Sequence, residues 1–219
     1  MRKTLIKICG MTNINDILCT NDIIDVDYIG IIFTEKSPRY VTFDIAEKLI
    51  HACDDSKKIV AVFMNQTKDY VTTAVNNLDL DVLQFHGNES PDYCRQFKKP
   101  FIKSFHIKNN SLDINKEFIK YAYSILLDTS TKDLDGGTGQ TFNWQILNNN
   151  KLLKEISLPY FIAGGLNTLN IKDLILKYNP PGIDVSSGLE SDIRKKDHLL
   201  MKKFIENVRI SERERNEKK

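Results

Sequence analysis

Eight short apolar segments alternate along this chain with eight stretches of helical periodicity. The strand-like segments are rich in β-branched residues and span 5–8, 28–33, 59–63, 82–85, 101–105, 124–127, 160–163 and 182–185. The helical stretches span 14–21, 43–52, 68–77, 91–98, 115–121, 144–156, 171–177 and 197–208. Continuous apolar strands that alternate with amphipathic helices are typical of a parallel sheet covered by helices. Eight such units predict an α/β fold, a single-domain (β/α)8 TIM barrel.

An open, doubly wound sheet that binds a dinucleotide is the structural alternative. Its fingerprint would be G-x-G-x-x-G directly after the first strand. The chain instead reads Cys-Gly-Met-Thr-Asn at 9–13, which lacks the required glycines. The sequence therefore favours the closed barrel.

The length of the chain predicts a single domain, and its near-neutral charge gives no indication of a nucleic-acid or membrane partner. The 219 residues can bury a single core, and 31 basic and 29 acidic residues give a formal net charge of +2. No apolar signal region and no run of about 18 apolar residues is present. We expect a cytoplasmic protein whose catalytic barrel spans 1–208, with a polar tail at 209–219 that is frayed or disordered.

The four cysteines, Cys9, Cys19, Cys53 and Cys94, are far apart and form no cluster of metal-ligand spacing. We therefore expect no metal site, and three of the thiols read as small packing residues. Cys9 differs because it lies where the first strand gives way to a loop. Asp128 ends the sixth strand in the same way. Active sites of such barrels are built at these strand ends, so a thiol and a carboxyl there suggest an acid/base pair.

The loops after strands seven and eight contain the residues expected of a phosphate site. Gly164 and Gly165 follow one strand, and Ser186, Ser187 and Gly188 follow the other. Barrels commonly bind phosphate at these two places through backbone N–H groups, and glycine lets the main chain approach the oxygens. The alternative is that both are only tight turns. A phosphorylated small molecule is the implied ligand.

Two further strand ends and one long loop offer polar groups. Arg39 could bind a carboxylate through its guanidinium fork, or could be a solvated surface residue. His86 could face the site or only satisfy a loop hydrogen bond. The glycine-rich stretch Asp135–Gln140 is long enough for a lid that excludes water, and could equally be a passive loop.

Eight segments, in order from about residue 5 to about residue 205, resemble the phosphoribosylanthranilate isomerases. They are Lys7–Thr12, Lys36–Val41, Val60–Asn65, Leu83–Glu89, Leu126–Thr129, Gly136–Trp144, Ala163–Asn167 and Asp184–Glu190. The resemblance implies an Amadori rearrangement of N-(5-phosphoribosyl)anthranilate in tryptophan biosynthesis, without cofactor or metal. It also implies that Asp128 is the acid that opens the sugar ring and Cys9 the base. Arg39 would hold the anthranilate carboxylate, and the regions of Gly165 and Ser187 the phosphate.

Strand alternation adds an expectation about the barrel interior. Lys7 shares a face with Cys9, Asp184 shares a face with Ser186, and strands one and eight meet where the barrel closes. We therefore expect Lys7 and Asp184 to pair beneath the site, with Asp184 also reaching the substrate pocket. The Lys7 ammonium is a possible source of the positive charge that helps a thiol ionise.

The chain departs from the usual family pattern at three places. Asp135 stands where an aromatic residue is common, Asn143 replaces an aspartate, and 191–193 lacks the usual Pro-Gly before the last helix. These changes bear on lid packing, on the start of that helix and on substrate affinity. Two alternatives stay open: a catalytically silent barrel that binds phosphorylated metabolites, and an isomerase of a related aminoaldose phosphate. Whether the protein is a monomer or a homodimer also stays open.

Overall fold

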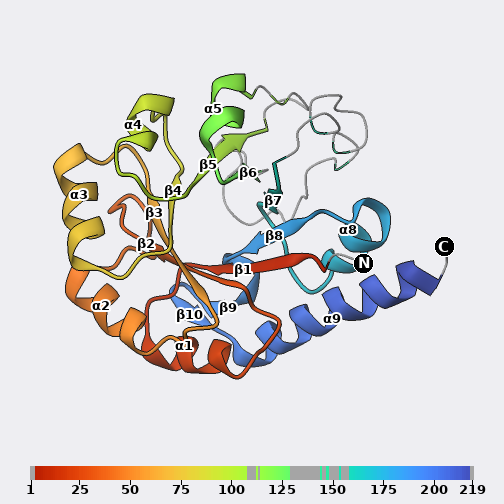
Figure 1. Ribbon diagram of the computed structural model, residues 1–219. Coiled ribbons are helices and arrows are strands. Elements are labelled where there is room, and N and C mark those ends of the chain that lie inside the picture. Colours follow the sequence, from red (N-terminus) through yellow and green to blue (C-terminus); the bar gives the residue numbers. More distant parts are fainter. Residues whose placement is uncertain are drawn as a thin grey trace.

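The eight predicted strands close into one parallel barrel in the computed structural model (Figure 1). The structure describes residues 3–107, 112, 114–128, 144, 147, 153 and 158–217. In barrel order the strands are β1 (Leu5–Cys9), β2 (Tyr28–Ile32), β3 (Lys58–Phe63), β4 (Val82–Phe85), β5 (Phe101–His106), β6 (Ser124–Asp128), β7 (Tyr160–Ala163) and β8 (Gly182–Val185). The (β/α)8 prediction is confirmed, because β1 pairs in parallel with both β2 and β8 and so completes the ring.

Helices cover the outside of the barrel (Figure 1). Those described are α1 (Ile14–Asn21), α2 (Phe43–His51), α3 (Lys68–Asn77), α4 (Pro91–Arg95), α5 (Lys116–Tyr121), α8 (Ile171–Tyr178) and α9 (His198–Glu217). Side-chain caps fix several starts: Thr42 accepts a hydrogen bond from the Ile45 N–H, and Ser90 caps α4 ahead of Pro91. The helix predicted at 144–156 lies outside the described residues except for three buried side chains.

Alternation along the strands divides the core into two layers. Inside the barrel, side chains such as Tyr28, Val60, Leu126 and Phe161 pack together in one cluster. The opposite faces of the same strands pack against the helices in a larger cluster. Strands buried on both faces have little room for polar groups, so each inward polar side chain requires a partner.

Lys7 and Asp184 form the expected pair across the seam of the barrel. The two residues are direct neighbours in the β1–β8 register, and the Lys7 Nζ lies 2.9 Å from Asp184 Oδ1. The Lys7 side chain is completely buried and that of Asp184 nearly so. Burial alone would lower the pKa of Lys7, but Asp184 and Cys9 together outweigh it and the pKa is raised. The ammonium is therefore charged inside the barrel.

The polar C-terminal stretch continues α9 as far as Glu217, so the described part of the tail predicted at 209–219 is helical. Arg209 is buried and donates hydrogen bonds to the carbonyl oxygens of Thr4 (3.0 Å) and Asp25 (3.2 Å). Ser211 is fully buried and donates to the Asn207 carbonyl. Composition misled because the charged side chains of this segment tie α9 to the N-terminal end of β1 instead of facing water.

A small antiparallel hairpin follows β8, and the sequence analysis did not foresee it. After a short 3-10 turn (Ser187–Leu189) come β9 (Glu190–Asp192) and β10 (Lys195–Lys196). Arg194 takes a left-handed φ of 72° in the turn and donates to the carbonyls of Pro38 and Tyr40. The hairpin thus lies against the loop after β2. The last helix nevertheless starts where predicted, because the Asp197 carboxylate caps it.

Breaking the Lys7–Asp184 pair should destabilise the fold. Lys7→Met leaves an uncompensated buried carboxylate, and we expect it to lower the free energy of unfolding by about 3–5 kcal/mol. Lys7→Met combined with Asp184→Leu should regain most of that loss, because no buried charge remains. Urea denaturation checks both. A single variant as stable as the wild type would show that the pair is dispensable.

The ordered C-terminal segment makes a second prediction. Arg209→Met removes buried charged hydrogen bonds and should lower the free energy of unfolding by roughly 1.5–3 kcal/mol. Arg213→Met, at an exposed position of the same helix, is the matched control and should change it by about 0.5 kcal/mol or less. Equal effects of the two substitutions in thermal or urea unfolding would contradict the docking of α9 through Arg209.

Candidate active site

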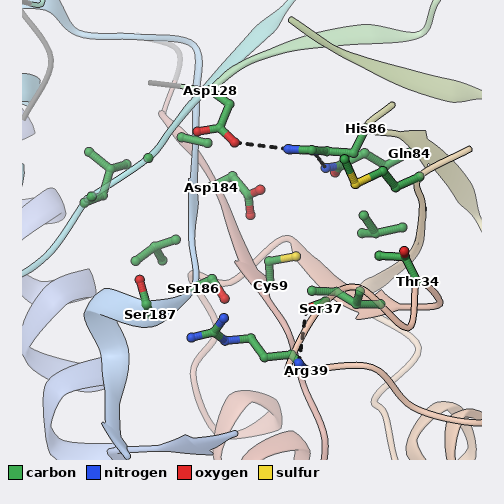
Figure 2. A pocket seen from close by; sticks show the side chains of 18 of the residues that line it. Cys9, Thr34, Ser37, Arg39, Gln84, His86, Asp128, Asp184, Ser186 and Ser187 are labelled. Atoms are coloured by element: carbon green, nitrogen blue, oxygen red, sulfur yellow. Dashed lines mark hydrogen bonds and ion pairs between the residues drawn. The ribbon is translucent and has the colours of Figure 1, made fainter. Parts of the chain in front are cut away.

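A cavity of about 340 Å³ opens at the carboxyl ends of the strands. Most of the predicted site residues line it, namely Cys9, Arg39, His86, Asp128, Gly164, Gly165, Asp184, Ser186 and Ser187. Figure 2 shows the side chains of seven of them around one hollow: Cys9, Arg39, His86, Asp128, Asp184, Ser186 and Ser187. Gly188 is not on the wall; a Cβ there would lie 1.9 Å from the Leu166 carbonyl oxygen, so this glycine lets the loops after β7 and β8 pack together.

Cys9 ends β1 and points into the barrel, where it is only 6 % exposed. The opposing residue on β2 is Gly30, and a Cβ there would lie 2.6 Å from Cys9 Sγ and 3.0 Å from Lys7 Nζ. Gly30 therefore leaves the space that both side chains occupy. The sequence analysis missed it, although a glycine inside an apolar strand is a signal of close approach.

The pKa of Cys9 lies above its ordinary value. Burial raises it, Asp184 adds to the rise, and the nearby ammonium groups of Lys7 and Lys196 only partly oppose it. The expectation that Lys7 would help the thiol ionise is thus met in direction, but burial prevails. In the pocket without a ligand, Cys9 is therefore a protonated thiol at neutral pH.

Asp128 ends β6 and is hydrogen-bonded to a histidine. His86 Nε2 lies 3.1 Å from Asp128 Oδ2, and Gln84 Nε2 lies 3.3 Å from His86 Nδ1 (Figure 2). His86 therefore faces the site, as one of its two interpretations required. Gln84, which sequence reasoning did not single out, lies in β4 two residues before His86 and orients its imidazole ring. This set of contacts places the carboxyl group at the rim of the cavity.

His86, Asp128 and His106 also form a group of the type that can hold a metal ion. One potential ligand atom from each lies within 4.8 Å of the others. The two imidazole rings meet edge to face with centroids 5.1 Å apart. Nitrogen and carboxylate oxygen are ligands that zinc accepts. His86 lies directly after β4, and His106 and Asp128 end β5 and β6, a juxtaposition that spacing along the sequence does not reveal.

The loops after β7 and β8 present a surface suited to an anion. Gly164 and Gly165 have φ values of 90° and 65°, and space beyond the Gly165 Cα is open. The Ser186 Oγ is buried, and it has no hydrogen-bond partner among the residues that the structure describes. An unpaired buried hydroxyl beside glycine-rich backbone is a place where a ligand oxygen would gain a hydrogen bond.

Arg39 reaches the cavity from the loop after β2, and its guanidinium is already held by an acidic residue. Its side chain crosses Gly10, where a Cβ would lie 2.5 Å from Arg39 Cδ. Nε donates to Glu190 Oε1 at 2.6 Å and Nη2 donates to Glu190 Oε2 at 2.5 Å. Arg39 is therefore not the solvated residue of the alternative interpretation. Burial would raise the pKa of Glu190, but Arg39 and Lys196 outweigh it and the pKa is lowered.

The predicted lid at 135–140, with the departures at Asp135 and Asn143, lies outside the described residues.

Comparison with known proteins gives one consistent family. The family model described as N-(5'phosphoribosyl)anthranilate (PRA) isomerase matches residues 6–207. N-(5'-phosphoribosyl)anthranilate isomerase of Legionella pneumophila (strain Corby) is 42% identical over 205 residues, covering 93% of this chain and 96% of that protein.

Solved structures agree with the sequence relatives. The phosphoribosyl anthranilate isomerase of Thermotoga maritima superposes with a TM-score of 0.81 at 30% identity, covering 94% of this chain and 98% of its own. A phosphoribosyl anthranilate isomerase in complex with reduced 1-(o-carboxyphenylamino)-1-deoxyribulose 5-phosphate superposes with a TM-score of 0.78 at 28% identity, with the same coverage.

The raised pKa of Cys9 makes a prediction about its reactivity. Iodoacetamide alkylates the thiolate, so below the pKa of a cysteine its alkylation rate rises about tenfold per pH unit. For an ordinary thiol this rate stops rising above about pH 8.5. Peptide mapping by mass spectrometry should show Cys9 still accelerating where an unfolded 5–13 peptide has levelled off. A Cys9 rate that levels off at lower pH than the peptide would contradict the assigned electrostatics.

Proposed function

This chain belongs to the N-(5'-phosphoribosyl)anthranilate isomerase family, and we propose that Cys9 and Asp128 are the proton-transfer groups of its pocket. Its function is the isomerase step of tryptophan biosynthesis, an Amadori rearrangement of an aminoaldose phosphate into the corresponding aminoketose. The observation that carries the residue assignment is the placement of the Cys9 thiol and the Asp128 carboxyl group on the wall of a single cavity, whose other carboxyl group, Asp184, is paired with Lys7. The barrel formed by 1–208 is the proposed catalytic domain.

The chemistry follows from the positions of these two groups. Asp128 donates a proton to the furanose ring oxygen, the bond from that oxygen to carbon 1 breaks, and the anilino nitrogen becomes an iminium cation. The Cys9 thiolate then removes the proton from carbon 2, which leaves a neutral enolamine. Protonation at carbon 1 and loss of the hydroxyl proton at carbon 2 give the ketone. No bond to the protein forms at any step.

A thiol with a raised pKa is compatible with this base role. The iminium brings a positive charge next to carbon 2, and a nearby cation favours the thiolate. Cys9 thus gives up its proton to solvent and becomes the thiolate once the ring has opened. In the empty pocket the protonated thiol avoids a buried negative charge beside Asp184.

The two ends of the substrate have separate proposed binding places. The phosphate lies against Gly164, Gly165, Ser186 and Ser187, where backbone N–H groups and an unpaired hydroxyl favour an anion. Gly188 supports those loops from behind. The anthranilate carboxylate lies toward Arg39 on the other side of Cys9. His86 orients the acid, and Asp184 neutralises Lys7 beneath the base.

The expected partner is thus a phosphorylated small molecule. Within the described part of the chain, no helix has both the length and the apolar character to cross a membrane. A cytoplasmic location and the lack of a nucleic-acid partner stay predictions. A histidine-pathway aminoaldose phosphate stays open as an alternative substrate, although relatives of that kind generally use two aspartates where this chain has Cys9 and Asp128.

The assignment is tested by steady-state turnover of freshly generated phosphoribosylanthranilate, followed by the loss of anthranilate fluorescence. We expect Cys9→Ser and Asp128→Asn each to lower kcat about 10²–10⁴-fold, the usual contribution of general acid–base catalysis. Matched controls are Cys53→Ser, outside the cavity, and Asp92→Asn, whose side chain is 87% exposed; both should keep wild-type rates.

Phosphate-ligand binding without wild-type turnover would instead favour the silent barrel. Full activity of either pocket variant would remove that residue from the proposed acid/base pair.

A further inference from the structure

The hairpin after β8 contributes a buried charged cluster at the edge of the cavity. Lys196 Nζ lies 3.1 Å from Glu190 Oε1, the same oxygen that accepts from Arg39 Nε. The side chains of Lys196, Glu190 and Arg39 are 1%, 5% and 17% exposed. Lys196 also donates to the Ser186 carbonyl at 3.0 Å. One carboxylate is therefore shared by two cations, which both contact its Oε1 atom.

The geometry of Arg39 leaves one edge of its guanidinium for a ligand. Glu190 takes the edge formed by Nε and Nη2. Within the described part of the chain, no hydrogen bond from Nη1 is found, and the Nη1–Nη2 edge can also bind a planar carboxylate with two parallel hydrogen bonds. Glu190 thus fixes the direction of the fork without occupying all of it.

The charge count explains why a second cation is needed. Arg39 and Glu190 alone form a neutral pair, and a neutral pair attracts a ligand carboxylate weakly in a partly desolvated pocket. Lys196 raises the cluster to a net charge of +1. The other buried cation near Cys9 is Lys7, whose charge Asp184 already balances. Lys36 also lines the cavity, but its side chain is exposed to solvent. Among the buried groups of the described pocket, the uncompensated positive charge at this side therefore comes from the three-residue cluster.

We propose that Lys196 is a positioning residue that keeps the Arg39–Glu190 pair net cationic and thereby sets the affinity of the pocket for the carboxylate of its substrate. The inference rests on the proposed function and goes beyond it, because Lys196 acts through Glu190 and Arg39 from a hairpin outside the barrel wall. It predicts coupling between Lys196 and one functional group of the ligand.

The experiment compares two ligands that differ by that group. One is reduced 1-(o-carboxyphenylamino)-1-deoxyribulose 5-phosphate, and the other is the same compound without the ring carboxylate. Isothermal titration calorimetry gives the dissociation constant of each for the wild type, Lys196→Met and the control Lys195→Met, whose side chain is exposed on the same hairpin.

We expect Lys196→Met to weaken the carboxylate ligand about tenfold, about 1.4 kcal/mol, and the carboxylate-free ligand less than about twofold. Lys195→Met should change neither by more than about twofold. Lys196→Gln, which keeps a hydrogen-bond donor and removes the charge, should behave like Lys196→Met and serves if the methionine variant does not fold.

Equal weakening of both ligands would show a merely structural role for Lys196 and overturn the inference, as would unchanged binding of both. A wild type that binds both ligands, with parallel losses in the variant, contradicts this inference alone. A wild type that binds neither contradicts the proposed function and the inference with it.

Discussion

The ion pair between Lys7 and Asp184 is the interaction on which the site depends. It lies at the seam where β1 meets β8, so the same contact closes the barrel and fixes the relative height of the two strands. Cys9 follows Lys7 by two residues along β1, and Ser186 follows Asp184 by two residues at the end of β8. A shift of the register by one residue would turn both to the helix-covered face. Barrel closure and site assembly are therefore one requirement.

Two buried cations, Lys7 and Lys196, lie near Cys9 and have different roles. Lys7 is neutralised by Asp184 within the barrel interior, where an unpaired charge would be very unfavourable. Lys196 shares Glu190 with Arg39, so that cluster retains a positive charge. The Cys9 thiol is thus placed between the Lys7–Asp184 pair, which has no net charge, and the Arg39–Glu190–Lys196 cluster, which has a net positive charge. Burial keeps the thiol neutral in the empty pocket although both cations favour its ionised form. The unbalanced cluster leaves attraction for an anionic substrate.

Much of the fold could be predicted from the sequence because the barrel repeats one simple pattern. Alternation of strand and helix predicts eight strands, and the period of two along β1 and β8 predicts the Lys7–Asp184 pair. Composition instead predicted a frayed tail at 209–219, whereas 209–217 is helix and buries Arg209 and Ser211. Composition does not report which charged side chains find partners.

The electrostatics of the site could be predicted less well. Glu190 is 151 residues from Arg39, and it reaches that side chain from a hairpin whose strands have three and two residues, too short to show a period. Gln84 contacts His86 two residues further along the same segment, but the contact that gives it a role, between His86 and Asp128, joins residues 42 positions apart. Such contacts depend on loop geometry, whereas the barrel depends on periodicity.

The most direct test of the acid/base assignment is a crystal structure of this protein with reduced 1-(o-carboxyphenylamino)-1-deoxyribulose 5-phosphate. The account predicts Cys9 Sγ beside carbon 2 of the ligand and an Asp128 oxygen beside the hydroxyl oxygen on carbon 4, which was the ring oxygen of the substrate, each at about 3–3.5 Å. A ligand bound with carbon 2 turned away from Cys9, or with Asp128 directed at the phosphate, would contradict it.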